Sequence, residues 1–280
     1  MADEGSRRWW WASPVFVIGM LGGFGAYSMW AAVQADHFCY DEFDESTLEC
    51  HGPYLSPFYS PLLTKQSPII GSALPGPSMD IGISTVYLLS PALLILWMPV
   101  GFRLTCYYYR KAYHRSFLMH PPACGVDEIF VRKDRRSFIG KYDGETKFFF
   151  ITNLHRYFFY LAFLVLAFLW WDTILAFWHK GAFHLGVGSV LFLVNVILLS
   201  MYSLSCHSLR HILGGRLDCF SCDLKVSTWF RIWQGASVLN KKHMEFAWCS
   251  LITVMASDMY VRGLSMGIIP ACVDAFGAGC

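Results

Sequence analysis

Five long apolar runs constrain the fold of this chain more than any other feature of its sequence. They cover residues 14–33, 81–104, 148–178, 183–204 and 244–268. Each run reaches the roughly 20 residues that an α-helix needs to cross the hydrocarbon core of a bilayer. Of the 280 residues, 55% are hydrophobic and only 15% are charged, which excludes an ordinary soluble domain. The sequence therefore predicts an all-α polytopic membrane protein, a five-transmembrane-helix bundle that forms one domain over residues 1–280.

Basic residues are distributed unevenly between the two sides of the membrane that this arrangement creates. If the N-terminus is cytoplasmic, 19 of the 22 Lys and Arg residues lie inside, and only Lys65, Lys180 and Arg262 lie outside. Because cytoplasmic segments beside membrane helices are enriched in Lys and Arg, we expect an inner N-terminus and an outer C-terminus. The outer loop then covers residues 34–80, and the inner loops cover residues 105–147 and 207–243.

The cysteines follow the same division between the two sides. Four of them fall outside, where an oxidising compartment permits disulfides: Cys39, Cys50, Cys272 and Cys280. This set can supply two bridges, whose connectivity the sequence does not determine. Five cysteines fall inside, where thiols stay reduced or bind a metal: Cys106, Cys124, Cys206, Cys219 and Cys222.

Thiol and imidazole side chains gather at the cytoplasmic ends of four predicted helices. Cys106 and Cys206 end the second and fourth helices, and His155 and His243 open the third and fifth. In an up-and-down bundle these four residues lie at one depth. Two thiolates with two neutral imidazoles suit either a tetrahedral zinc ion or a Rieske-type two-iron cluster. Each residue alone is better explained as a helix cap or a small apolar side chain, but the set indicates a metal or haem site.

His207 and His211 form a competing pair of imidazoles. They are four residues apart, so on a helix they share one face. One or both could bind iron or line a proton path. They could equally belong to a solvated helix end beside Arg210 and Arg216. The residue types alone leave these alternatives open.

Two other classes of function are less well supported by the sequence. A small polytopic transporter is the main alternative, but no inverted repeat is evident and polar residues are sparse in the middle of the apolar runs. The sequence also lacks a Walker motif, a glycine-rich dinucleotide fingerprint and a nucleophile elbow. Flavin or nucleotide chemistry would therefore have to come from a partner.

Five segments resemble the membrane anchor of actinobacterial-type succinate dehydrogenase, the respiratory complex II. They are residues 105–110 (TCYYYR), 121–124 (PPAC), 153–157 (NLHRY), 205–211 (SCHSLRH) and 239–244 (LNKKHM). The resemblance implies a five-helix anchor in the inner (plasma) membrane of a bacterial cell, bound to a flavoprotein subunit and an iron–sulfur subunit. The partners oxidise succinate in the tricarboxylic acid cycle, and this chain is a subunit of the enzyme. It implies that membrane lipid surrounds the chain and that no nucleic acid binds to it. Whether the complex forms a higher oligomer is left open.

The resemblance also implies a membrane-embedded Rieske-type [2Fe–2S] cluster that passes electrons to quinone. The two-Cys, two-His ligand set carries over first to Cys106, Cys206, His155 and His243, with His207 and His211 as the competing imidazoles. Other five-helix anchors carry haem b, which needs imidazoles at two depths. Only His179 and His184 could form an outer tier here, which favours one cluster over haem.

A quinone pocket is expected close to the inner helix ends. Such a pocket needs aromatic side chains that sandwich the ring and a donor for its carbonyl. Four residues in these segments suit the two roles: Tyr107, Tyr109, Arg156 and Trp248.

Overall fold

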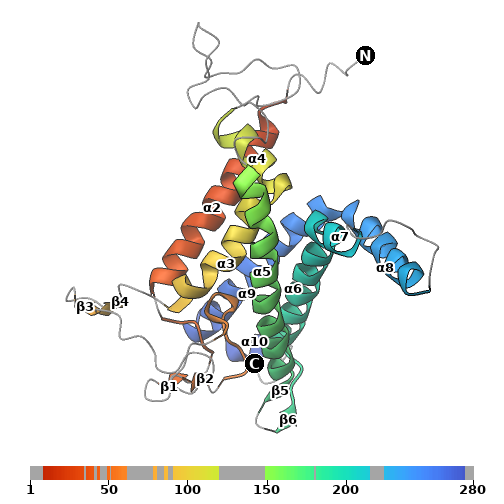
Figure 1. The fold of residues 1–280 in the computed structure, drawn as a ribbon. Helices are drawn as coiled ribbons and strands as arrows, with labels where there is room; N and C mark the ends of the chain where they lie inside the picture. The colour runs from red at the N-terminus through yellow and green to blue at the C-terminus, as the bar shows by residue number, and fades with distance from the viewer. Residues whose placement is uncertain are drawn as a thin grey trace, which may run out of the picture. The chain divides into compact units, whose positions relative to one another are not determined.

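Helices dominate the part of the chain that the structure describes (Figure 1). This computed structural model describes residues 9–34, 36–40, 43–44, 49–50, 52–61, 78–80, 85–87, 91–119, 149–179, 181–214 and 224–274. The helices are α2 (Ala12–Gln34), η1 (Pro57–Tyr59), α3 (Pro91–Thr105), α4 (Tyr107–Phe117), α5 (Phe149–Ala176), α6 (Val187–Leu204), α7 (His207–Gly214), α8 (Leu224–Asn240), α9 (His243–Ser265) and α10 (Ala271–Asp274). The antiparallel strand pairs are β1 (Phe43–Asp44) with β2 (Glu49–Cys50), β3 (Ser78–Asp80) with β4 (Thr85–Tyr87), and β5 (Trp178–His179) with β6 (Ala182–Phe183).

Three of these helices are long and apolar enough to cross a membrane. They are α2, residues 154–176 of α5, and α6; residues 92–105 of α3 form a shorter apolar helix. Helix α9 has 23 residues, or about 34 Å at 1.5 Å per residue, but it carries Glu245, Asp258 and Arg262. The prediction of a helical membrane protein is confirmed, whereas the number of five spans stays a prediction.

The second predicted span differs from the structure at its start. Helix α3 begins at Pro91 rather than near residue 81, and part of the preceding segment pairs as β3 and β4. Strand β4 consists of Thr85, Val86 and Tyr87, which are β-branched or aromatic and favour extended backbone. Proline is favoured in the first turn of a helix because its missing N–H would have no partner there. Apolar character alone does not distinguish these two conformations.

The predicted inner loops contain three helices that no long apolar run indicates. Helix α4 lies within residues 105–147, and α7 and α8 lie within residues 207–243. Helix α4 is rich in Tyr, Arg, Lys and His, so it has no apolar run. Helix α7 ends at Gly214, where the Gly214–Gly215 pair predicts a helix stop. Much of the basic inner loop, residues 120–148, lies outside the described residues.

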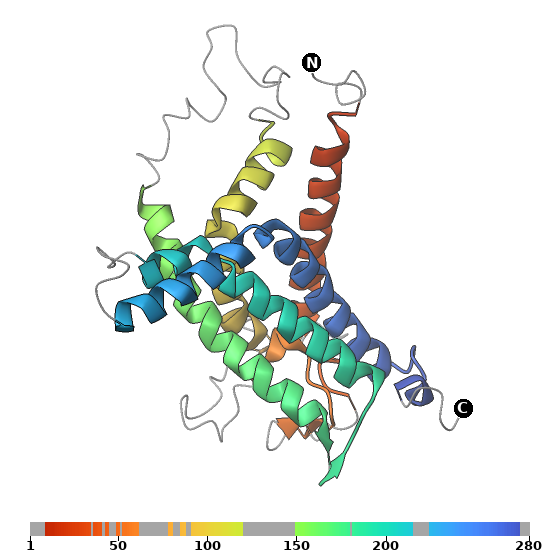
Figure 2. The same cartoon turned by 90° about the vertical axis from the view of Figure 1, so that its right-hand side faces the viewer.

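The chain divides into two compact units, and the single domain over residues 1–280 stays a prediction. The first unit comprises residues 1–30 and 100–158, and the second comprises residues 31–99 and 159–280. In the second unit α6 and α9 pack side by side (Figure 2). Buried apolar residues of α3, α5 and α6 form one core cluster of this unit: Ile95, Val165, Leu166, Leu169 and Val196.

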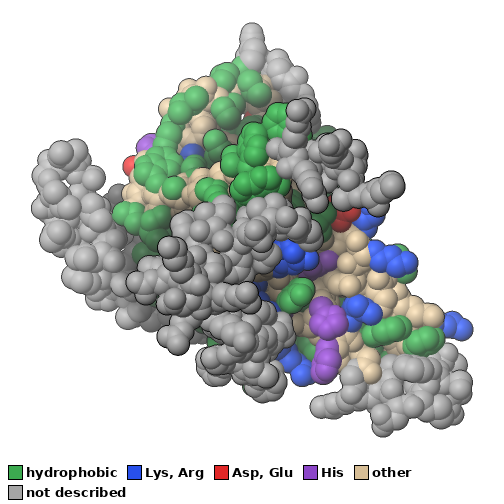
Figure 3. All heavy atoms as spheres, turned by 90° about the horizontal axis from the view of Figure 1, so that it is seen from above, with side chains coloured by type: hydrophobic (Ala, Val, Ile, Leu, Met, Phe, Trp, Pro, Cys, Tyr) green, Lys and Arg blue, Asp and Glu red, His purple; other side chains and the backbone are tan. Residues whose placement is uncertain are grey.

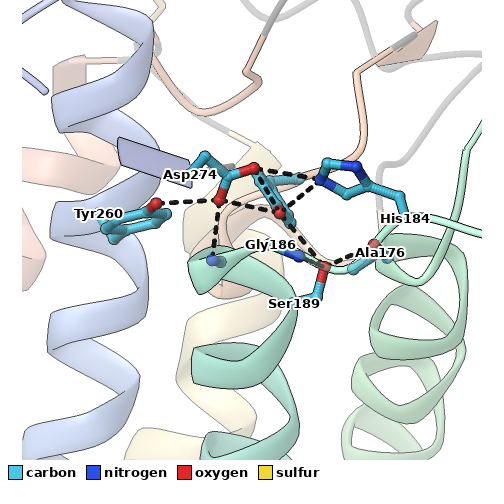
Figure 4. A network of polar contacts seen from close by, with 8 residues as sticks. Ala176, His184, Gly186, Ser189, Tyr260 and Asp274 are labelled. Carbon is cyan, nitrogen blue, oxygen red and sulfur yellow. Dashed lines mark hydrogen bonds and ion pairs between the residues drawn. The ribbon is translucent and has the colours of Figure 1, made fainter. Parts of the chain in front are cut away.

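The buried carboxylate of Asp274 connects several segments at one end of the second unit through hydrogen bonds (Figure 4). Tyr54 and Tyr260 donate their hydroxyl groups to it, at 2.9–3.0 Å and 2.9 Å. The backbone N–H of Gly188, in the first turn of α6, also donates to it at 2.9 Å, and His184 Nε2 lies 3.1 Å away. Burial raises the pKa of Tyr54, so its hydroxyl keeps the proton that it donates. Asp274 therefore supplies a partner to an α6 N–H that has none within the helix.

A buried ion pair lies in the last turns of α9, and its arginine also donates hydrogen bonds to the end of α2. Arg262 donates through Nε to Asp258 at 2.9 Å, and Ser56 donates to the other oxygen of the same carboxylate. The remaining guanidinium nitrogens donate to the Gln34 side chain and to the backbone carbonyls of Asp36 and Ala31, at 2.8–2.9 Å. The charge of Arg262 is thus fully paired inside the second unit.

Three of the four cysteines predicted to lie outside are in disulfides. Cys39 is bonded to Cys50, and Cys272 is also in a disulfide. The segment around Cys39 lies near the end of α9, because His37 Nδ1 is 3.2 Å from the Ser265 hydroxyl. Cys280, the fourth cysteine of the predicted set, lies outside the described residues.

A methyl group at residue 186 is expected to disrupt the Asp274 network. A Cβ on Gly186 would lie 2.5 Å from Asp274 Oδ2 and 2.5 Å from the Tyr54 hydroxyl. Both groups are buried, so Gly186→Ala should destabilise the protein by about 1–3 kcal/mol, the usual cost of overpacking. Thermal unfolding of the purified protein measures this. Gly23→Ala in α2, where a Cβ meets nothing within 4 Å, is the control, and equal midpoints for the two variants would contradict the prediction.

Candidate thiol–imidazole sites

One predicted thiol and one predicted imidazole lie in the first unit, next to the break between α3 and α4. Cys106 is buried and has extended backbone (φ −61°, ψ 129°), so it separates the two helices. Its carbonyl accepts the Arg110 N–H at 2.8 Å. His155 in α5 is only 8% exposed, and its Nδ1 lies 2.9 Å from the Thr105 hydroxyl. The ring of His155 stacks on Phe102, with centroids 4.9 Å apart and planes 3° apart.

The other predicted thiol and imidazole repeat this arrangement in the second unit. Cys206 is buried and separates α6 from α7, and its carbonyl accepts the Arg210 N–H at 3.3 Å. His243 is the first residue of α9, and its Nδ1 lies 2.8 Å from the Ser205 hydroxyl. Its ring stacks on Tyr202 at 5.0 Å with 21° between the planes. Each unit therefore holds one buried thiol, one stacked imidazole and one hydroxyl on Nδ1.

The competing imidazoles lie in a different environment. His207 and His211 are both exposed on α7, with no buried residue in that helix. Figure 3 shows histidine side chains at the surface among Lys and Arg side chains. On α7 the neighbouring Arg210 contacts α8: it donates to Ser237 and Asn240 and lies over the Trp233 ring. Because His207 and His211 are exposed, they are weaker candidates for a buried metal site than His155 and His243.

The residues predicted for a quinone pocket are divided between the two units. Tyr107 is 66% exposed and lies beneath Arg110, whose Cζ is 5.5 Å from its ring centroid. Tyr109 is buried, and its hydroxyl accepts from Arg103 at 2.6 Å. Burial raises the pKa of Tyr109, so it contacts Arg103 as a neutral phenol. Arg156 is exposed in the first unit, and Trp248 is half-buried on α9 in the second.

The donor set of each unit is too small to hold a metal by itself. Among the described residues no group of three or more His, Cys, Asp or Glu side chains is arranged to bind a metal ion. Each unit supplies one Cys and one His of the predicted set. Buried thiols and imidazoles with a hydrogen bond at Nδ1 are nonetheless chemically suited to iron or zinc, because metal-bound histidines regularly engage their second nitrogen in this way.

The hydroxyl and aromatic companions of the histidines were not predicted from the sequence. They lie in a short pattern that occurs twice, as FRLTC at residues 102–106 and YSLSC at residues 202–206. In each copy an aromatic residue stands four positions before the cysteine, and Thr or Ser stands directly before it. This repeat is a signal that could have identified Phe102, Thr105, Tyr202 and Ser205.

The apolar helices and the paired thiol–imidazole sites define a multi-pass helical membrane protein with candidate metal ligands. The family model of the actinobacterial succinate dehydrogenase subunit SdhC matches residues 12–267. The chain therefore belongs to this family. It is the membrane-anchor subunit of a succinate dehydrogenase, lies in the inner membrane as a multi-pass protein, and works as part of an enzyme complex.

A solved structure agrees with this family assignment. A chain of the Mycobacterium smegmatis Sdh1 complex in the apo form is 34% identical, with a TM-score of 0.74. The similarity covers 96% of this chain and 91% of that chain. A comparison with curated proteins gives no match.

Proposed function

We propose that this chain is the quinone-reducing subunit of its succinate dehydrogenase. It accepts electrons from the iron–sulfur subunit, which sits with the flavoprotein subunit on the cytoplasmic face, and passes them through an embedded Rieske-type [2Fe–2S] cluster to quinone. The observation that carries the proposal is the pair of matching sites, each with a buried thiol and a stacked, hydrogen-bonded imidazole.

The proposed ligands are Cys106, Cys206, His155 and His243. When bound, such a cluster supplies one-electron chemistry at a potential well above that of an all-thiolate centre, because imidazoles replace two thiolates. The thiols of Cys106 and Cys206 are buried, and stacking on Phe102 and Tyr202 orients the rings of His155 and His243. His207 and His211 are less suitable because they are exposed.

A haem b anchor is less well supported than a cluster. A second tier of imidazoles would have to use His184 or His179. His184 Nε2 lies 3.1 Å from both Asp274 and the Tyr54 hydroxyl, so this ring already has a role in the second unit. Haem ligation by His184 would require that network to open.

Spectroscopy of the purified complex tests the proposed cofactor. A Rieske-type EPR signal, together with iron and acid-labile sulfide beyond the content of the soluble subunits, is the expected result. A reduced haem absorption band without that signal would support the haem alternative. If neither is present, both assignments fail.

The proposed quinone site uses aromatic residues near the same helix ends. Tyr107 and Trp248 offer ring faces, and Arg156 offers a donor for a quinone carbonyl. Tyr109 contributes as a buried wall, because its hydroxyl is held by Arg103 at 2.6 Å. This assignment rests on residue chemistry and on exposure.

We further propose that the N-terminus is cytoplasmic and the C-terminus is outside. The distribution of disulfides and thiols supports this orientation. Cys39 and Cys50 are bonded near the end of α9, whereas Cys206 is a thiol at the C-terminal end of α6, where α9 begins. Disulfides persist in oxidising compartments and thiols in reducing ones.

Thiol labelling in intact cells tests the orientation. After treatment with a membrane-impermeant reductant, Cys39 and Cys50 should react with a membrane-impermeant maleimide, and without reductant they should not. Peptide mass spectrometry identifies the labelled residues, and Cys39→Ser with Cys50→Ser is the control. Labelling of Cys219 or Cys222 from outside would show that the opposite orientation is correct.

A further inference from the structure

We propose that the helical hairpin of α7 and α8 lies along the membrane surface and binds the headgroups of anionic phospholipids. The hairpin comprises the two helices His207–Gly214 and Leu224–Asn240, both in the second unit. This inference uses neither the cluster nor the quinone site. It assigns a lipid partner to a part of the chain that the proposed electron path leaves without a role.

Both ends of the hairpin are held at the end of a candidate membrane span. Only Ser205 and Cys206 separate α6, which is long and apolar enough to cross a membrane, from α7. The other end leads through two residues into α9, whose first residue His243 has its Nδ1 2.8 Å from the Ser205 hydroxyl. Figures 1 and 2 show α8 running sideways from the end of α6 rather than continuing its direction. The hairpin therefore lies where α6 leaves the bilayer.

Contacts of Arg210 hold the two helices of the hairpin together. This side chain of α7 donates through Nε to the Ser237 hydroxyl at 3.0 Å and to the Asn240 side chain at 3.2 Å. Its Cζ lies 5.4 Å from the centroid of the Trp233 ring. Asn240 in turn donates to the Ser205 carbonyl at 2.7 Å, which ties α8 to the end of α6. These contacts use the side of α8 that carries Trp233 and Ser237.

The exposed part of α8 has an apolar side and a basic side. Trp229 and Ile232 are 43% and 49% exposed, and because they are three residues apart they share one side of the helix. Arg231 is exposed, and at about 100° per residue it points well away from both. A helix with Trp and Ile on one side and cations on another is typical of one that lies in the membrane interface, where Trp is enriched.

The charge of the hairpin favours anionic lipid over neutral lipid. Neither α7 nor α8 contains an Asp or Glu residue, and Arg231, Lys241 and Lys242 are exposed. Lys242 lies 3.4 Å from Glu245, but this pair is itself exposed, so it contributes little and leaves the ammonium group free to bind a phosphate. Basic residues beside a membrane helix attract anionic headgroups. The adjacent apolar side of α8 favours lipid over the acidic surface of a protein partner.

Photo-crosslinking tests which side of α8 contacts lipid. A benzophenone amino acid replaces Trp229, Ile232 or Val238 in the whole complex, which is then placed in nanodiscs that contain phosphatidylglycerol and phosphatidylcholine. Mass spectrometry of the illuminated subunit should show lipid adducts from positions 229 and 232. Val238 is the matched control, because it is 63% exposed but lies nine residues after Trp229, on about the opposite side of the helix. Position 238 should give no lipid adduct.

Lipid titration tests the preference for anionic headgroups. The detergent-solubilised complex is titrated with phosphatidylglycerol or phosphatidylcholine, and native mass spectrometry counts the bound lipids. Replacing Arg231, Lys241 and Lys242 by Gln should weaken phosphatidylglycerol binding by about 5-fold for each cation removed and leave phosphatidylcholine binding unchanged. Lys241→Arg with Lys242→Arg keeps the charge and should bind phosphatidylglycerol as the wild type does. Only intact complexes are counted, so failed assembly does not imitate lost binding.

Three results would overturn this inference. A crosslink from position 232 to the iron–sulfur subunit would show that a protein covers the hairpin. Lipid adducts from position 238 and none from 229 or 232 would show that the apolar side of α8 does not face the bilayer. Equal binding of the two lipids by the wild type, or unchanged phosphatidylglycerol binding by the Gln variant, would remove the headgroup assignment. None of these measurements depends on a cluster signal or on quinone reduction, so failure of the proposed function is detected separately.

Discussion

Replacing His155 and His243 together by alanine is expected to abolish quinone reduction while leaving succinate oxidation by a soluble artificial acceptor close to the wild-type rate. Succinate chemistry takes place on the partner subunits, upstream of this chain. The two imidazoles are the proposed ligands that give the cluster its raised potential. The loss of quinone reduction should exceed the roughly 10–100-fold that follows removal of an outer-shell partner of a metal ligand. The Rieske-type EPR signal should disappear with the activity.

His207→Ala with His211→Ala is the matched control for this double substitution. These two imidazoles belong to the same subunit but are exposed on α7, so both the signal and the activity should survive. If this control loses them while the first double variant keeps them, the α7 pair supplies the ligands. If neither variant affects the quinone step, the embedded cluster itself is ruled out. The amount of intact complex, measured after affinity purification, separates these outcomes from failed assembly.

Arg262→Met is expected to destabilise the protein more strongly than Gly186→Ala. The side chain of Arg262 is 3% exposed and that of Asp258 is 0% exposed. Methionine fills much of the volume but leaves the Asp258 carboxylate buried without its cation. It also removes the donors to Gln34, Asp36 and Ala31. Breaking a buried pair by removing one partner costs about 3–5 kcal/mol, which thermal unfolding of the purified complex can measure.

A surface ion pair on the same helix provides the control for Arg262→Met. Lys242 lies 3.4 Å from Glu245, and the two side chains are 67% and 47% exposed. Exposed pairs contribute about 0–1 kcal/mol, so Lys242→Met should change stability little. Adding Asp258→Asn to Arg262→Met should recover part of the loss, because it removes the uncompensated charge. No recovery would show that lost packing, and not the buried charge, dominates.

The sequence predicted the helices wherever an apolar run and a helix coincide. Helices α2, α5 and α6 begin and end within a few residues of the predicted spans. The predictions failed where a helix is polar or where an apolar segment pairs as a strand. Helix α4 is polar, and its helical structure does not depend on an apolar run, whereas residues 85–87 are apolar enough for a span but pair as strand β4.

The candidate ligands were predictable from the sequence, but their surroundings were not. Cys106, Cys206, His155 and His243 stand out because they lie where the predicted apolar runs begin or end. Thr105 and Ser205 are ordinary residues whose hydroxyls also bond to carbonyls of their own segments, and only the close approach of a distant helix adds an imidazole partner. The sequence separations of 50 and 38 residues between hydroxyl and imidazole explain why local patterns did not reveal them.

The contacts of the Asp274 carboxylate can form only late in the synthesis of the chain. Asp274 lies 86 residues after Gly188 and 220 residues after Tyr54 in the chain. At about 5–20 residues per second, the ribosome needs on the order of 10 s after adding Gly188 before it adds Asp274. During this interval the first turn of α6 lacks its acceptor. A nascent chain that stops before residue 274 would therefore lack the acceptor that Asp274 gives to Tyr54, Tyr260 and the Gly188 N–H.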